Sequence, residues 1–197
     1  MPAGTAGRRS ADAVEDISLH ILDIAENALR AHASRIEIVI SSDSRNDLLT
    51  VEVSDDGTGM DPDTLAKVRD PFFTTKRKKT GLGIPLVAQA AELAEGTFAI
   101  ESTPGKGTRV KAVFRLSHID RPAVGDMAGT VLTLIAGHPE VDIIYEERRD
   151  GAVSRLDTTE IKKDLEGVPI NEPAVLAAIR AMLNKDFILI NEGPTHE

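Results

Sequence analysis

Asp23 and Asn27 are the first residues along the chain whose types and spacing suit chemistry. They stand four positions apart in the stretch LDIAENALRAH, and in a helix that spacing places both side chains on one face, where they can point at one object. The amide oxygen of Asn27 is a hard, uncharged ligand for magnesium, and a carboxylate one turn away can orient or deprotonate a water molecule. The alternative is that both are ordinary polar residues of a helix, exposed to solvent. Taken alone, this pair of residues favours that alternative.

Asp55 is a second position of interest, because it follows an alternating run of residues and opens the segment DDGTGM. It should lie near the C-terminal end of a strand, where its carboxylate can accept a hydrogen bond from an exocyclic amine. Gly57 and Gly59 would let the backbone approach a flat ring closely. An ordinary Asp-Gly turn is the alternative, and a single DxGxG segment is weak support for a binding site.

A glycine-rich segment, TGLG at residues 80–83, stands just before a predicted helix with Pro85 in its first turn. Such a loop offers backbone N–H groups and the positive end of a helix dipole to a phosphate. The run KRKK, which begins at Lys76, lies just ahead and could neutralise phosphate charge. Taken alone, a charged run in a loop is usually solvated.

The hydrophobic pattern predicts the elements that must position these residues. Apolar residues at helical spacing predict helices over 17–31, 61–68, 85–94, 127–137 and 172–183, the first with Ser18 as its N-cap. Alternating residues bounded by turn signals predict strands over 35–41, 48–54, 96–103, 108–116, 141–148 and 152–158. Helices and hairpins in this order indicate an α+β fold.

Composition limits the classes of protein that this chain can represent. At 197 residues, 41% hydrophobic and 28% charged, it is an ordinary globular chain with room for one sizeable core, and 3% aromatic residues make that core aliphatic. The net charge of −9 argues against a protein that coats nucleic acid. The lack of cysteine excludes disulfides and thiolate-bound metals, so any metal must be held by oxygen or imidazole ligands.

No apolar run approaches the ~20 residues needed to span a bilayer. The first fifteen residues contain paired arginines but no apolar segment typical of an export signal, so we expect a flexible tail over residues 1–15. Cytoplasmic localisation and no contact with a membrane are therefore expected.

Taken in series, the motifs resemble the nucleotide-binding domain shared by DNA gyrase, the Hsp90 chaperones, sensor histidine kinases and the MutL proteins. This is the GHKL superfamily, and the resemblance covers about residues 18–116, including PFFTTK, TGLG and PGKGTRV. It implies the Bergerat fold, a two-layer α/β sandwich with a mixed sheet and helices on one face. We expect this ATP-binding domain over residues 16–117 and a small C-terminal α+β unit of unknown role over 118–197.

The resemblance also assigns roles to individual residues. Asn27 is similar to the family's magnesium ligand, and Asp23 occupies the position of the general base. Asp55 matches the aspartate that binds adenine, and Thr108 falls where the last strand approaches the base. The remaining positions implied to contact the nucleotide are Ala31, Gly57, Gly59 and Met60 around the base, and Lys76, Thr80, Gly81, Leu82 and Gly83 in the lid.

Three features qualify the function that the resemblance implies. Asp23 replaces the commoner glutamate and reaches one methylene less far, Lys79 stands where histidine kinases commonly have glycine, and Pro85 stands where they have serine. Only a short tail precedes the first helix, so we do not expect a helical hairpin with a phosphoacceptor histidine. The remaining eighty residues are also too few for the transducer domain of a DNA-remodelling clamp.

Two functions remain as expectations. The first is a stand-alone regulatory protein kinase that binds ATP with Mg²⁺ and transfers the γ-phosphate to an unidentified partner protein. The second is an ATP-dependent interaction switch with slow or no hydrolysis. Either protein would bind ATP and ADP, a homodimer is compatible with both, and nucleic acid is not expected as a partner.

Overall fold

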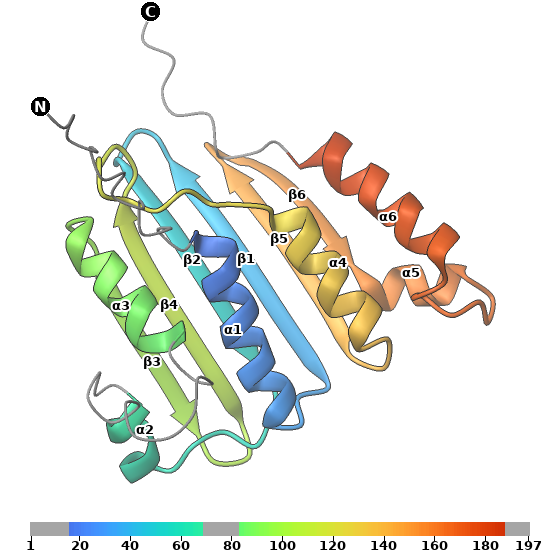
Figure 1. Cartoon of the computed structure of the whole chain (residues 1–197), viewed down its shortest axis with the longest axis horizontal. Coiled ribbons are helices and arrows are strands. Elements are labelled where there is room, and N and C mark those ends of the chain that lie inside the picture. Colours follow the sequence, from blue (N-terminus) through green and yellow to red (C-terminus); the bar gives the residue numbers. More distant parts are fainter. Residues whose placement is uncertain (1–15, 69–82, 188–197) are drawn as a thin grey trace, which may run out of the picture.

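A mixed six-stranded sheet forms the centre of the protein, with strand order β3-β4-β2-β1-β5-β6. The computed structural model describes residues 16–68 and 83–187. Helices α1, α3 and α4 lie side by side on one face of the sheet (Figure 1). The strands are β1 (Arg35–Asp43), β2 (Leu48–Asp55), β3 (Thr97–Thr103), β4 (Gly107–Arg115), β5 (Asp142–Arg149) and β6 (Ala152–Asp157). The helices are α1 (Ile17–Arg30), α2 (Pro62–Val68), α3 (Gly83–Leu93), α4 (Met127–Gly137), α5 (Thr158–Asp164) and α6 (Pro173–Asp186).

This architecture confirms the predicted α+β class with a mixed sheet, and most element boundaries fall within two residues of the prediction. The N-cap of α1 was predicted wrongly. Asp16, in extended conformation, accepts a hydrogen bond from the Leu19 N–H, and the Ser18 hydroxyl donates to the same Asp16 oxygen at 2.6 Å. Ser18 is therefore a buried residue of the first turn that orients the cap, because the capping oxygen must come from the residue before the helix.

The hairpin of β1 and β2 sets the position of the site. Every second residue of β1 faces the helices, and Ile36, Ile38 and Ile40 on that face are fully buried. The antiparallel registers place Asp55, the last residue of β2, between Ile36 of β1 and Thr108 of β4. The alternating pattern in the sequence thus carries Asp55 to the end of a buried strand, as predicted.

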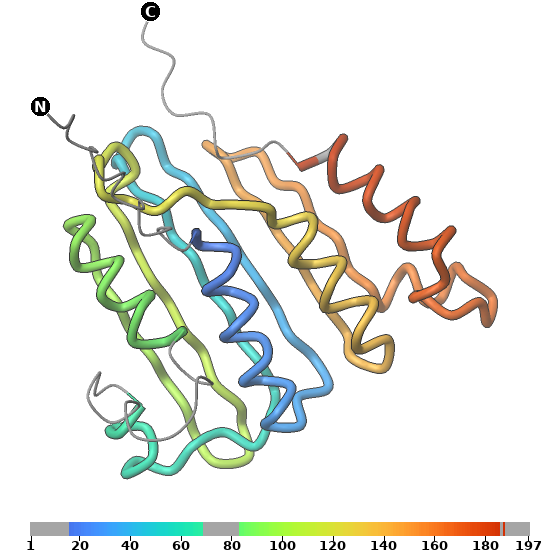
Figure 2. The backbone as a smooth tube through the Cα atoms, viewed as in Figure 1, coloured from blue at the N-terminus to red at the C-terminus, as the bar shows by residue number. Residues whose placement is uncertain are grey.

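The C-terminal segment continues the same sheet. β5 pairs in parallel with β1, with Ile143 opposite Ile36, and β6 completes the sheet as an edge strand. The connection from β4 to α4 passes the N-terminus of α1, as the tube in Figure 2 shows, and the N–H groups of Ile17 and Ser18 donate to the carbonyls of Ala123 and Val124. The predicted division at residues 117 and 118 stays a prediction about independent folding; in space, the two segments share one sheet.

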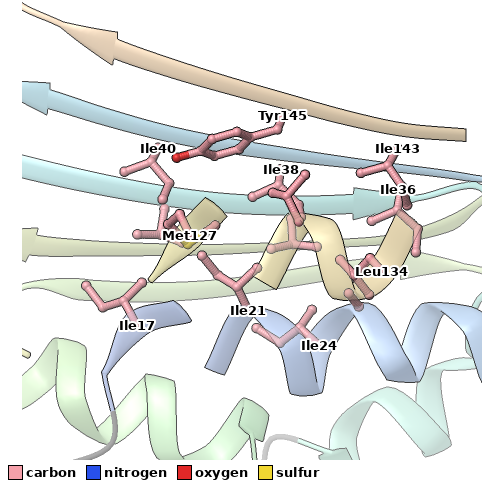
Figure 3. Close-up of a cluster of buried hydrophobic side chains, with 14 of the residues drawn as sticks. Ile17, Ile21, Ile24, Ile36, Ile38, Ile40, Met127, Leu134, Ile143 and Tyr145 are labelled. Atoms are coloured by element: carbon pink, nitrogen blue, oxygen red, sulfur yellow. The ribbon is translucent and has the colours of Figure 1, made fainter. Parts of the chain in front are cut away.

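The core lies where these two segments meet. Aliphatic side chains of α1, β1, α4 and β5 point toward one another, and Tyr145 is the single labelled aromatic residue among them (Figure 3). Helix α1 is packed between α3 and α4, so both segments hold the helix that carries the candidate site residues. The residues labelled in Figure 3 are Ile17, Ile21, Ile24, Ile36, Ile38, Ile40, Met127, Leu134, Ile143 and Tyr145.

Helix α5 was not predicted from the sequence. Asp157 caps it by accepting a hydrogen bond from the Thr159 N–H at 2.9 Å, and Glu160 follows three residues later. An acidic cap followed by glutamate at that spacing is a known signal for a helix start, but α5 has only seven residues. Over residues 16–68 and 83–187, no helix combines the length and the apolar character needed to cross a membrane.

Candidate functional site

A cavity of about 240 Å³ opens between α1, the ends of β2 and β4, and the start of α3. Most of its lining is aliphatic. Its polar side chains are Asn27 of α1 and the pair Asp55 and Thr108, which are direct neighbours in the sheet. Such a space suits a flat ring with one polar edge. The lining residues are Ile24, Asn27, Ala28, Ala31, Asp55, Gly59, Met60, Val68, Ile84, Thr108 and Val110.

The structure therefore brings together six of the residues that the sequence singled out: Asn27, Ala31, Asp55, Gly59, Met60 and Thr108. Gly57 lies behind the lining, and Asp23 and Gly83 lie beside it. Lys76, Thr80, Gly81 and Leu82 lie outside the described residues, as do the predicted tail and the KRKK run.

Asp55 is a carboxylate held by amides rather than by a cation. Its Oδ1 atom accepts the Gly57 N–H at 2.8 Å. Burial raises the pKa of Asp55 above its usual range, and backbone hydrogen bonds from Gly57 and Thr108 oppose the rise. A partly buried oxygen of this kind accepts strongly from an uncharged donor such as an exocyclic amine.

Gly57 and Gly59 are glycines for steric reasons that can be measured. A Cβ on Gly57 would lie 2.7 Å from the Ala31 carbonyl oxygen, the atom to which the Thr58 N–H donates. Gly59 has a φ of +64°, and a Cβ there would lie 2.1 Å from the carbonyl oxygen of Thr103. The loop after β2 is thus pressed against the end of α1 on one side and against the β3–β4 turn on the other.

Asn27 is half-buried at the cavity wall, and a cation already contacts its amide oxygen. The Oδ1 atom accepts a hydrogen bond from the Arg30 guanidinium at 2.7 Å, and Arg30 also pairs with Glu26 at 2.8 Å. The oxygen that the resemblance assigns to magnesium is therefore one that attracts positive charge in this structure. Glu26 supports this contact through Arg30 and is itself exposed.

Asp23 lies one turn before Asn27 and faces the start of α3. A Cβ on Gly83 would lie 2.6 Å from the Asp23 Cβ and 3.1 Å from its Oδ2. The first turn of α3 carries no acidic residue of its own, so the exposed Asp23 carboxylate stands at the positive end of that helix dipole. A glycine is needed at position 83 because any side chain would displace Asp23.

Five lining residues were not singled out from the sequence. Ile24 and Ala28 share a helical face with Asn27 and Ala31, so the spacing of three and four residues is a signal that could have identified them. Val68, Ile84 and Val110 come from three other elements. Only the packing of the whole fold brings these three to the cavity.

Comparison with known proteins identifies the class. Residues 13–118 match the family described as "Histidine kinase-, DNA gyrase B-, and HSP90-like ATPase". The match covers more than half of the chain and includes every cavity residue. The chain therefore belongs to this family, whose domains bind ATP, and the GHKL resemblance is confirmed.

Individual relatives point to sensor kinases. The chain is 42% identical over 88 residues to the sensor protein kinase FleS of Pseudomonas aeruginosa. These matched residues are 45% of this chain and 22% of the relative. It is 36% identical over 98 residues to the sensor histidine kinase DcuS of Escherichia coli (49% and 18%). A putative sensor protein of Shewanella frigidimarina is 33% identical over 103 residues (51% and 16%). The matched region thus spans less than a quarter of each of these relatives.

Proposed function

We propose that this chain binds ATP with magnesium in the cavity beside α1 and acts as a regulatory protein kinase that transfers the γ-phosphate to a partner protein. The observation that carries the proposal is the position of Asp55 beside Thr108 in the sheet, in a cavity whose lining is aliphatic apart from these two residues, Asn27 and Gly59. The aliphatic walls accept the faces of the adenine ring. The Asp55 carboxylate accepts a hydrogen bond from the 6-amino group, which guanine lacks at that position.

Magnesium fits the donor set at Asn27. Among the described residues, no group of three or more histidine, cysteine or acidic side chains could hold a metal ion alone. Mg²⁺ in nucleotide sites takes few protein ligands and fills its shell with phosphate oxygens and water. Asn27 would supply the protein oxygen, and the ion would supply charge neutralisation for the phosphates.

Asp23 is the proposed base. It stands one turn from Asn27 and against the first residue of α3, on the side of Asn27 where the phosphates would lie if the base occupies the cavity. In the transfer, the acceptor atom of the partner bonds to the γ-phosphorus, the bond to the ADP oxygen breaks, and Asp23 accepts the proton that the acceptor loses. The partner is therefore a protein with a nucleophilic side chain.

Two measurements test this proposal. Calorimetric titration with ATP and with GTP, each with MgCl₂, should show binding of ATP and much weaker binding of GTP. Incubation with γ-labelled ATP and candidate response-regulator or other signalling proteins should then leave stable label on a partner. Equal affinities for ATP and GTP would overturn the adenine site, and the absence of label on every partner would overturn the kinase.

The second candidate is an interaction switch, in which bound ATP changes the affinity for a partner without phosphate transfer. The position of Asp23 favours it, because its carboxylate packs against Gly83 and does not line the cavity. A switch would bind its partner with different affinities in the ATP-bound and ADP-bound states, and the partner would remain unlabelled. Partner capture in the presence of each nucleotide therefore separates the two candidates.

A further inference from the structure

A second cavity lies directly behind the proposed adenine site. It also measures about 240 Å³, and it shares Asp55 and Thr108 with the first cavity. Ser102 of β3 lines only this second cavity, so Ser102 lies behind the wall that the nucleotide would contact. In the sheet, Ser102 stands directly opposite Thr108.

The Ser102 hydroxyl joins three parts of the site. Its oxygen accepts the Met60 N–H at 2.8 Å, it donates to the Gly107 carbonyl at 3.0 Å, and it lies 3.0 Å from the Thr108 hydroxyl oxygen. Met60 and Thr108 both line the first cavity. One side chain that touches no nucleotide is therefore bonded to two residues that would.

Counting protons fixes the direction of the contact between the two hydroxyls. A hydroxyl has one proton to donate and two lone pairs with which to accept. The carbonyl of Gly107 can only accept, so its bond uses the single proton of Ser102. Ser102 then accepts from Met60 and, with its second lone pair, from Thr108. Because the Thr108 proton points back to Ser102, the Thr108 hydroxyl can present only lone pairs to the cavity.

We propose that Ser102 is a positioning residue that holds the Thr108 hydroxyl as an acceptor toward the nucleotide, and so sets a preference for 6-amino over 6-oxo purines. This inference rests on the proposed function, since it assumes that the cavity binds a purine nucleotide. The end of the cavity then presents two acceptors, Asp55 and Thr108. An amino group has two N–H donors to offer them, whereas the oxygen of a 6-oxo purine meets lone pairs on both sides.

The test compares ATP with inosine triphosphate, which carries the same ribose and phosphates but has a 6-oxo group. The full-length parent chain should prefer ATP. In Ser102→Ala, the Thr108 proton is released and can turn toward the cavity, so the ratio of ATP to inosine triphosphate affinity should fall by about two- to tenfold, the effect of one hydrogen bond. Calorimetric titration of both nucleotides measures the ratio directly.

Three further variants separate this role from a structural one. Ser102→Ala also leaves the Met60 N–H without its acceptor, which should weaken both nucleotides alike and leave the ratio unaffected. In a Thr108→Val background, Ser102→Ala should not change the ratio, because no hydroxyl remains to reorient. Ser54→Ala removes a hydroxyl from the same second cavity, and it should keep the parent ratio. Ser102→Thr retains a hydroxyl at this position, so it should show the same ratio of ATP to inosine triphosphate affinity as the parent.

The outcomes distinguish this inference from the proposed function. If the parent binds neither nucleotide, both fail. If the parent prefers ATP and Ser102→Ala keeps the parent ratio, the inference is overturned and the adenine site stands. The inference is also overturned, and the adenine site stands, if Ser102→Ala changes the affinity ratio by the same factor in the Thr108→Val background as in the parent. Should Ser102→Ala fail to fold, Ser102→Cys fills the same space with a weaker donor and acceptor, and it carries the same expectation and the same contrary result.

Discussion

Two carboxylates, the partly buried Asp55 and the buried Glu146, have pKa values shifted in opposite directions. Asp55 ends β2 in the nucleotide-binding region, and its pKa is raised by burial against opposing amides. Glu146 lies in β5 of the C-terminal region. Burial raises its pKa too, but hydrogen bonds from Arg148 and Arg155 outweigh burial and hold the pKa below its usual value.

This difference is the one expected between a carboxylate that serves a ligand and one that serves the fold. Glu146 has its full complement of cationic partners within the protein, so no ligand is needed to stabilise its charge. Asp55 lines a cavity, accepts hydrogen bonds from two backbone amides, and has no cationic partner among its contacts with described residues. A cavity carboxylate whose pKa is raised by burial, with no cation to stabilise its charge, is typical of a binding site.

The largest expected effect concerns the dependence of the first region on the second. Deleting residues 118–197 removes α4 and β5 from the core and exposes the edge of β1. Each buried aliphatic side chain contributes ~1.5–3 kcal/mol, so the loss exceeds the ~5–15 kcal/mol net stability of a typical domain. We expect the truncated chain to show no cooperative thermal transition by circular dichroism.

Leu134→Ala in the full chain is the control for that deletion. It removes part of one buried side chain of α4 and should cost ~2–5 kcal/mol while leaving a folded, ATP-binding protein. A truncated chain that melts cooperatively near the parent's midpoint would instead establish residues 16–117 as an independent domain.

Asp55→Asn addresses the ligand side of the comparison. The amide offers N–H donors where an acceptor is needed, so ATP affinity should fall by roughly 1–3 kcal/mol, with a loss of selectivity against GTP. Calorimetry measures both quantities. Glu146→Gln is the matched control, because it neutralises a buried carboxylate two strands away that does not line the cavity, and it should leave ATP affinity unchanged. Unchanged binding in Asp55→Asn would remove the adenine assignment.

Local sequence patterns were sufficient to predict most elements but not their assembly. Alternation and helical spacing depend on neighbouring residues, so β1, β2 and α4 could be predicted from short windows. The parallel pairing of β5 with β1 joins residues about a hundred positions apart, and no local pattern encodes which edge a strand will choose. Helix α5 was missed because its signal is a single capping pair on a very short helix.

The candidate site shows the same limit. Motif residues such as Asp55 could be predicted because the chemistry demands particular residue types next to glycines. Ile84 and Val110 are ordinary aliphatic residues whose place at the cavity depends on tertiary packing. The contact of Arg30 with Asn27 was also unforeseen, although the spacing of three residues on one helix would permit it.

A smaller effect separates Asn27 from Asp23 within the first region. Asn27→Ala should weaken Mg²⁺-dependent ATP binding by about 1 kcal/mol, the usual contribution of one polar contact. Asp23→Asn should retain ATP affinity and reduce phosphate transfer, because a base acts mainly in the transition state. Titrations with and without MgCl₂, together with single-turnover labelling, distinguish the two. Equal losses of affinity would show that Asp23 serves binding or structure.

The smallest expected effect is the contribution of Glu146 to stability. Glu146→Gln keeps the shape of the side chain but removes its charge, and Arg148 and Arg155 are 51% and 42% exposed. Solvent screening of such half-exposed partners limits the loss to about 1 kcal/mol at neutral pH. Urea unfolding of parent and variant, compared at pH 7 and at low salt, measures it.

The pH dependence of that difference completes the comparison. Because the folded pKa of Glu146 lies below its ordinary value of 4.5, its contribution is fully present above 4.5 and is lost as the pH falls through the lowered pKa. Parent and Glu146→Gln should therefore converge in stability at acidic pH. Asp55→Asn should behave in the opposite way. A raised pKa means that the ionised Asp55 destabilises the ligand-free protein at neutral pH, and this cost is lost as the pH falls through the raised pKa to the ordinary value of 3.8. Ligand-free Asp55→Asn should thus be no less stable than the parent at pH 7. If Asp55→Asn and Glu146→Gln lose the same amount of stability at pH 7, then Asp55, like Glu146, serves the stability of the fold and not a ligand.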